Sequence, residues 1–129
     1  GAQAVVEGCG SNGCEYMTGG IVAILGKVGA NFGAGMTGGI AFVYDPDNEF
    51  QYRVNSDTVI YQRIETSYWR EVLKVLIGQH VKHTRSNHGE RLLHSWENIE
   101  KNFWQVVPKE MLDKLEHPVT FDTLLSKQA

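Results

Sequence analysis

The first 44 residues of this chain repeat with a period of nineteen, and this repeat limits the possible folds more than any other feature. The apolar run at residues 1–6 aligns with residues 20–25 and again with residues 39–44. Residues 1–19 and 20–38 share seven identical positions, including the Met-Thr-Gly segment that ends each unit. A fixed period of this length predicts a stacked architecture, in which each unit buries its apolar segment against its neighbours.

Glycine is concentrated in the same region, because twelve of the 14 glycines lie in residues 1–39. The six-residue apolar runs between the glycines are too short for a globular helix and lack helical spacing, so they indicate strands. Glycine at the turns permits positive φ and close stacking of backbones. We therefore assign a structural role to seven repeat glycines, which are Gly1, Gly10, Gly19, Gly20, Gly29, Gly38 and Gly39.

Strands and turns that alternate at one period predict a mainly β fold, most simply a parallel β-helix (a β-solenoid) of about three coils. Val5, Ile24, Leu25 and Val43 are expected on its buried inner face. An antiparallel meander is the alternative. It does not explain why similar repeats run in the same direction.

The second half of the chain changes to a helical period. Two stripes predict an α-helical hairpin, and they are Trp69, Leu73, Leu76 and His80, then Leu92, Trp96, Ile99 and Phe103. We divide the chain into residues 1–64, which hold the repeats and the closing strands at residues 50–54 and 59–61, and residues 65–129. The latter form the hairpin and a C-terminal tail, packed on the solenoid or on a neighbour.

Two features of the sequence suggest binding functions, namely dinucleotide binding and DNA binding. Residues 8–13 and 33–38 both read G-x-G-x-x-G, but neither opens an amphipathic helix as a dinucleotide site requires. The helical hairpin also suggests a helix-turn-helix DNA reader. Its acidic residues and its lack of a basic recognition face argue against that.

Charge and cysteine content narrow the class of protein further. The formal net charge is −3, and neither half is basic, which disfavours nucleic acid and anionic membranes as partners. No apolar stretch is long enough to span a membrane. Cys9 and Cys14 do not form a disulfide framework, so we expect a cytoplasmic location. Gly1 fits the repeat and no Met precedes it, which predicts an open first coil edge that supports homo-oligomers.

The candidate chemical groups are few. His80, His83 and His88 form the one cluster that resembles metal ligands, although His80 also fits a hydrogen-bonded core role. Glu7 and Glu15 are expected to accept hydrogen bonds from glycine amides in neighbouring turns. We assign no catalytic, cofactor-binding or metal-binding residue.

The repeat itself resembles a known family. The segment from Val6 to Gly20, then Leu25-Gly26-Lys27 and the segment from Asn31 to Gly39, is similar to the C-terminal GXGXG domain of the glutamate synthase large (alpha) subunit. The resemblance continues through His80-Val81-Lys82-His83-Thr84 and Phe103-Trp104-Gln105-Val106-Val107-Pro108. It implies a right-handed β-helix that braces other domains and is not itself catalytic.

The resemblance also implies properties of a parent enzyme. That enzyme makes L-glutamate from L-glutamine and 2-oxoglutarate, using FMN, an iron–sulfur cluster and NADPH. The implied partners of this segment are the amidotransferase and FMN domains of the same polypeptide. A free-standing β-solenoid protein-interaction module is the alternative.

Overall fold

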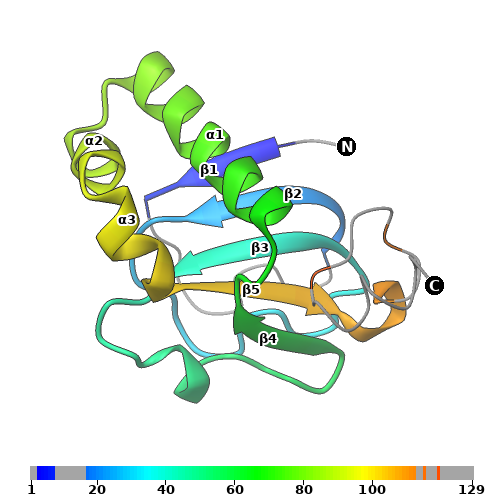
Figure 1. Ribbon diagram of the computed structural model, residues 1–129. Helices are drawn as coiled ribbons and strands as arrows, with labels where there is room; N and C mark the ends of the chain where they lie inside the picture. The colour runs from blue at the N-terminus through cyan, green and yellow to red at the C-terminus, as the bar shows by residue number, and fades with distance from the viewer. Residues whose placement is uncertain (1–2, 8–16, 113–114, 116–118, 120–129) are drawn as a thin grey trace.

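The computed structural model describes residues 3–7, 17–112, 115 and 119. The strands are β1 (Gln3–Val6), β2 (Thr18–Ile24), β3 (Gly38–Tyr44), β4 (Val59–Arg63) and β5 (Phe103–Pro108). The helices are α1 (Ser67–Thr84), α2 (Asn87–His94) and α3 (Trp96–Ile99), with short 3-10 turns η1 (Phe50–Tyr52), η2 (Glu100–Asn102) and η3 (Lys109–Met111). The strands form one mixed sheet in the order β1-β2-β3-β5-β4, and α1 crosses one of its faces (Figure 1).

The repeats become the three parallel strands at one side of this sheet. Ile21 of β2 pairs with Ile40 of β3, which is the nineteen-residue offset of the sequence. Gln3 of β1 pairs with Ile21, so the first register is one residue shorter than the sequence alignment predicts. A shift of one residue moves side chains to the other face. The observed pairing therefore places Val5, Ala23 and Phe42 together in one apolar cluster.

Two of the repeat glycines set the approach of β2 to β3. Gly20 and Gly39 occupy equivalent places and have φ of 84° and 80°, values that residues with a side chain rarely adopt. The pairing is irregular between Thr18 and Ile21, as at a β-bulge. A Cβ atom at Gly39 would lie 2.8 Å from the carbonyl oxygen of Gly20 and 2.9 Å from the carbonyl carbon of Gly19. The strand ends therefore need glycine for close contact.

The expected right-handed parallel β-helix of about three coils is wrong. The described strands form a single open sheet, and β5 from the second half of the chain pairs antiparallel with both β3 and β4. Between β2 and β3 the chain forms a loop whose Phe32 and Met36 are buried, with one isolated bridge from Phe32 to Val54. Parallel pairing of like repeats is compatible with an open sheet as well as with coils, which is why the period alone misled the prediction.

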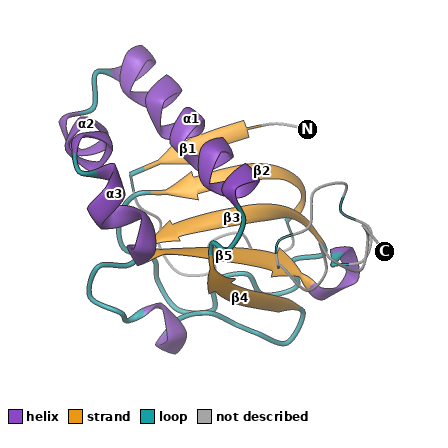
Figure 2. Ribbon diagram, in the orientation of Figure 1, coloured by secondary structure: helices purple, strands orange, loops and turns teal. Residues whose placement is uncertain are grey.

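Each face of the sheet has its own apolar cluster. The helices lie over one of these faces (Figure 2). On one face, α1 and α2 bury residues such as Trp69, Leu73 and Leu92 against Ala23 and Phe42. The opposite face is covered by loops, and its cluster comprises Ile24, Val28, Phe32, Met36, Ala41, Val43, Phe50, Val59 and Val106. Three of the four predicted core residues are buried, and Val5 packs at the edge as a partly buried side chain.

The second half follows the predicted hairpin only in part. The first helix agrees with its apolar stripe, whereas the second ends at His94 because Ser95 leaves helical geometry at φ −108° and ψ 27°. Phe103 continues the helical spacing but begins β5, a strand that was not predicted from the sequence. The expected strand at residues 50–54 is instead the turn η1. The division of the chain at residue 64 stays a prediction.

Substitution of Gly39 by alanine is expected to destabilise the fold by about 2 kcal/mol, because the new Cβ meets the Gly20 carbonyl and positive φ is unfavourable for alanine. Urea unfolding of the chain measures the change. The control is Gly78→Ala in α1, where nothing lies within 4 Å of the new Cβ and helix propensity rises, so stability should increase by about 0.5–1 kcal/mol. Equal effects at the two glycines would contradict the argument.

Candidate functional site

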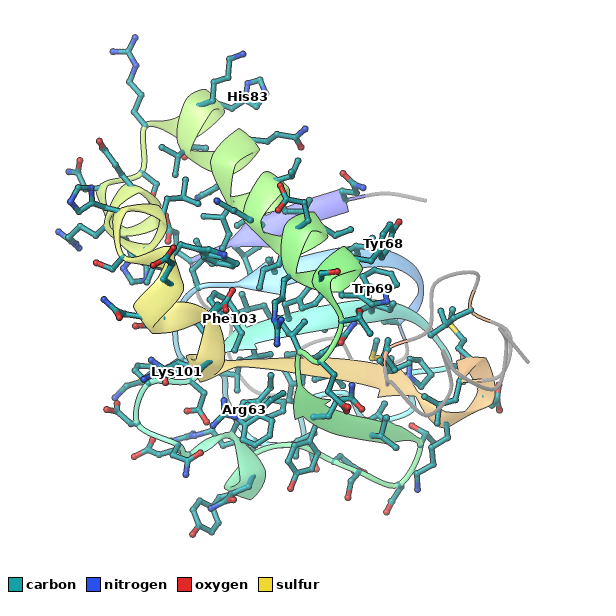
Figure 3. All side chains as sticks on the ribbon, viewed as in Figure 1. Arg63, Tyr68, Trp69, His83, Lys101 and Phe103 are labelled. Atoms are coloured by element: carbon teal, nitrogen blue, oxygen red, sulfur yellow. The ribbon has the colours of Figure 1, made fainter. Side chains whose placement is uncertain are left out.

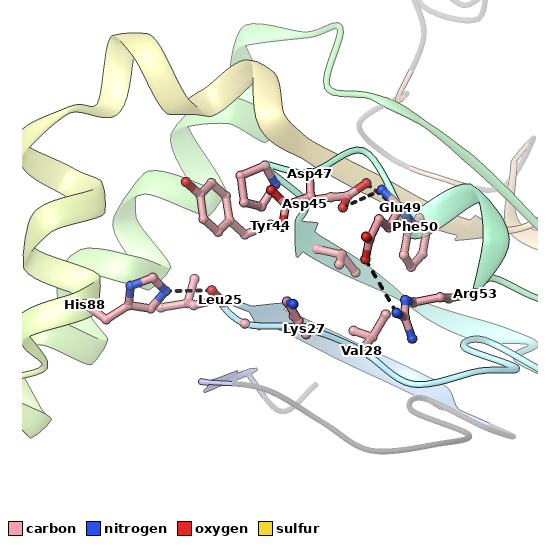
Figure 4. A pocket seen from close by; sticks show the side chains of 13 residues that line it. Leu25, Lys27, Val28, Tyr44, Asp45, Asp47, Glu49, Phe50, Arg53 and His88 are labelled. Carbon is pink, nitrogen blue, oxygen red and sulfur yellow. Dashed lines mark hydrogen bonds and ion pairs between the residues drawn. The ribbon is translucent and has the colours of Figure 1, made fainter.

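A pocket of about 200 Å³ lies beyond the carboxyl ends of β2 and β3 (Figure 4). In open sheets with parallel strands, this edge is where ligands most often bind. The floor is apolar, with Leu25, Val28, Val43 and Phe50 all buried. Further lining residues are Gly26, Lys27, Tyr44, Asp45, Pro46, Asp47, Glu49, Arg53 and His88.

Asp45 holds one wall of the pocket in place. Its Oδ1 accepts a hydrogen bond from the Glu49 amide at 3.0 Å, and its Oδ2 accepts from the Phe50 amide and from Trp104 Nε1, each at 2.9 Å. Burial raises the pKa of Asp45, but these three donors and nearby Arg63 together bring it below its ordinary value of 3.8. The ionised carboxylate therefore fixes the turn at residues 45–50 against β5.

Arg63 completes this support from β4. Its guanidinium carbon lies 3.6 Å from the centre of the Trp104 ring, and its Nη2 donates to Asn48 Oδ1 at 3.1 Å. A cation over an indole face is favourable when it is partly shielded from water. Burial lowers the pKa of Arg63, which Asp45 opposes. Asp45, Trp104 and Arg63 thus couple the pocket wall to strands β5 and β4.

The mouth of the pocket carries charges of both signs (Figure 4). Arg53 forms an exposed ion pair with Glu49, at 3.5 Å between Nη2 and Oε2. His88 Nε2 donates to the carbonyl oxygen of Leu25 at 2.7 Å, which ties α2 to the end of β2. Within the described residues, neither the Lys27 ammonium nor the Asp47 carboxylate has a hydrogen bond or ion pair.

A second polar cluster joins β1 to the helices. Glu7 Oε1 accepts from His80 Nε2 at 3.1 Å and from Ser86 Oγ at 2.5 Å. Ser86 Oγ in turn accepts from the amide of Gly89 at 3.0 Å and so caps α2. The Ser86 hydrogen bond is the largest influence on Glu7; burial opposes it, His80 adds to it, and the pKa of Glu7 is lowered from 4.5. The expected hydrogen bonds from the glycine amides of residues 8–13 to Glu7 involve residues outside the described part of the chain and stay a prediction.

The three histidines of the predicted cluster have separate surroundings. His80 contacts Glu7, His88 contacts Leu25, and His83 is exposed at the far end of α1 (Figure 3). Among the residues that the structure describes, no three His, Cys, Asp or Glu side chains are grouped so as to hold a metal ion. Cys9, Cys14 and Glu15 lie outside the described residues.

The second G-x-G-x-x-G match is used to build the sheet. Gly33 and Gly35 have φ of 78° and 67° in the loop, and Gly38 then begins β3 rather than a helix. Of the other repeat glycines, Gly19 is exposed, Gly29 lies in the β2–β3 loop, and Gly1 and Gly10 lie outside the described residues. The match at residues 8–13 also lies outside them.

The pocket and its supporting residues were not predicted from the sequence. The signal that could have identified Asp45 was its place directly before a proline at the end of an apolar run, where a side-chain carboxylate often closes a turn. No comparable signal indicated that Trp104, fifty-nine positions away, would donate to it. In the part of the chain that the structure describes, no helix is long and apolar enough to cross a membrane.

Comparison with known proteins identifies the family to which the chain is similar. The family model described as "GXGXG motif" matches residues 1–109. The chain is 53% identical to the glutamate synthase [NADPH] large chain of Azospirillum brasilense over 99% of its length. It is 50% identical to the ferredoxin-dependent glutamate synthase of Pyropia yezoensis over 83% of its length, and 44% identical to the chloroplastic enzyme of Spinacia oleracea over 99%. These matches cover only about 7–8% of the relatives' own length.

Replacement of Asp45 by asparagine is expected to lower the free energy of unfolding at pH 7 by about 1–3 kcal/mol, because the charge-assisted bonds to two amides and an indole are weakened. The lowered pKa means that the unfolded chain binds the proton more readily, so this stabilisation is present above about pH 4 and is lost as the pH falls through the folded-state pKa.

Urea unfolding between pH 7 and pH 3 measures this effect, and the difference between Asp45→Asn and the natural chain should shrink with acidity. Asp47→Asn is the matched control, since this neighbouring carboxylate is exposed and unpaired among the described residues. A pH-independent loss at Asp45, or an equal loss at Asp47, would show that the carboxylate bonds are not responsible.

Replacement of Ser86 by alanine should cost about 1 kcal/mol, because α2 loses its side-chain cap and Glu7 loses a donor. The control is Ser95→Ala, since Ser95 precedes α3 without a side-chain cap bond, and less than about 0.5 kcal/mol is expected. Thermal unfolding followed by circular dichroism compares the two. Equal losses would remove the case for a capping role.

Proposed function

Because this chain belongs to the GXGXG motif family, we propose that it is a non-catalytic structural domain near the C-terminal end of a glutamate synthase large chain. The observation that supports this most directly is the use made of the glycines. Gly20 and Gly39 permit close contact of parallel strands, and Gly33, Gly35 and Gly38 shape the loop and start the next strand. These glycines therefore serve the conformation of the backbone, which is a structural role.

The activity belongs to the parent protein in this proposal. That protein forms L-glutamate from L-glutamine and 2-oxoglutarate, with FMN and an iron–sulfur cluster held by other segments. NADPH is our proposed electron source, as in the name of the Azospirillum brasilense relative, although other relatives are named as ferredoxin-dependent. We place the protein in the cytoplasm. The proposed neighbours are the amidotransferase and FMN domains of the same polypeptide.

The edge of β1 is the surface that we assign to contact with a neighbour. β1 is the outermost strand of the sheet, so one side of it lacks a partner strand among the described residues. Val6 is 37% exposed, and Tyr68 and Val75 of α1 are 44% and 48% exposed. An unpaired edge beside exposed apolar side chains favours association. The same observation supports the second candidate function, a free-standing interaction module that forms homo-oligomers through this edge.

Activity measurements separate these functions from catalysis. We expect the isolated chain to show neither glutaminase nor glutamate-forming activity, whereas the full-length protein with Gly39→Ala should lose activity in proportion to its loss of folded material. The activity of each folded Gly39→Ala molecule should equal that of the natural protein, and the same is expected of the Gly78→Ala control. Turnover by the isolated chain, or a lower activity of fully folded protein with the exposed substitution His83→Ala, would overturn the structural role.

A further inference from the structure

The pocket beyond β2 and β3 has the size of a site for one side chain. Its volume is about 200 Å³, whereas sites for small molecules and cofactors usually enclose about 300 to 1,000 Å³. The floor is formed by buried aliphatic groups and the Phe50 ring. This combination favours an apolar group of the size of a leucine, methionine or phenylalanine side chain over a nucleotide or a flavin.

The charged side chains at the mouth of the pocket restrict which groups can flank an apolar occupant. Arg53 is already paired with Glu49, and the Asp45 carboxylate already accepts three hydrogen bonds. The basic side chain of Lys27, which follows β2, and the acidic side chain of Asp47, which follows β3, are therefore the charges available to an occupant. An occupant that is complementary therefore has an apolar group between an acidic and a basic group.

We propose that this pocket receives an apolar anchor side chain from another segment of the parent polypeptide, with an acidic neighbour facing Lys27 and a basic neighbour facing Asp47. The inference rests on the proposed structural function. It is supported by length, since relatives extend far beyond the 7–8% that this chain covers and can supply such a segment. Burial of one large apolar side chain within a polar rim is the usual composition of a contact between domains.

The pocket is rigid enough to act as a preformed receptor. Asp45 binds the turn at residues 49 and 50 to β5 through Trp104, and His88 binds α2 to the end of β2. Both walls are therefore held by hydrogen bonds between parts of the chain that are distant in sequence. Preorganisation of this kind lowers the entropy lost on association.

Photo-crosslinking in the full-length protein tests the proposal. The photoreactive residue p-benzoylphenylalanine replaces Pro46, which is exposed and lines the pocket, and the crosslinked peptide is identified by mass spectrometry. The expected product is an intramolecular crosslink to a segment outside these 129 residues that carries a large apolar residue between acidic and basic residues. The positional control places the same photoreactive residue at Glu97 on α3, which should not give this product.

Charge reversal then tests the rim. Lys27→Glu and Asp47→Lys should each lower the crosslink yield from position 46 by about two- to fivefold, as expected for exposed ion pairs. Lys82→Glu, a reversal at an exposed position of α1 outside the pocket, should leave the yield unchanged. Equal effects of Lys27→Glu and Lys82→Glu would overturn the proposed charge contacts.

The remaining outcomes are also decisive. A crosslink between two copies of the protein, a crosslink to a segment without an apolar residue, or no crosslink would each overturn the anchor proposal. Failure of the structural function gives a different result, because the isolated chain would then show turnover whether or not the crosslink forms. An inactive isolated chain without the crosslink would reject the anchor alone.

Discussion

The close backbone contact between β2 and β3 at Gly20 and Gly39 is the constraint on which the sheet depends. With φ near +80° at both residues, the two strand ends lie so close that a Cβ atom at Gly39 would meet the backbone of Gly19 and Gly20. That contact places Ile21 beside Ile40 and so assigns every following side chain to one face or the other. The two apolar clusters, one under the helices and one under the loops, both follow from this register.

The sequence predicted the local pairing well and the global architecture poorly. The nineteen-residue period, with Gly20 and Gly39 at equivalent places, correctly indicated neighbouring parallel strands. It did not reveal that β5 would pair antiparallel with β3, because Phe103 fits the preceding helical stripe as well as it fits a strand. Whether Phe103 belongs to a helix or to a strand depends on tertiary contacts, such as those with Tyr44 and Trp96. The spacing of neighbouring residues does not reveal such contacts.

The candidate site shows the same division. Glycine roles at residues 33–38 were predictable, because no helix pattern follows the motif. The pocket was not, since its walls join Asp45 to Trp104 and Leu25 to His88 across more than fifty positions. Likewise, the resemblance to the glutamate synthase large subunit is confirmed by the comparisons, while the β-helix inferred from it is not the architecture observed.

The position of β5 between β3 and β4 affects the order in which this sheet can be completed. β3 and β4 are both made before β5, yet they are not neighbours, since β5 lies between them. During synthesis on the ribosome, β3 and β4 therefore each have an edge without its β5 partner until residues 103–108 have left the exit tunnel. The helices, whose contacts are mostly local, can form in this interval. Sheet closure is thus a late event, in which β5 inserts between two strands that were both made before it.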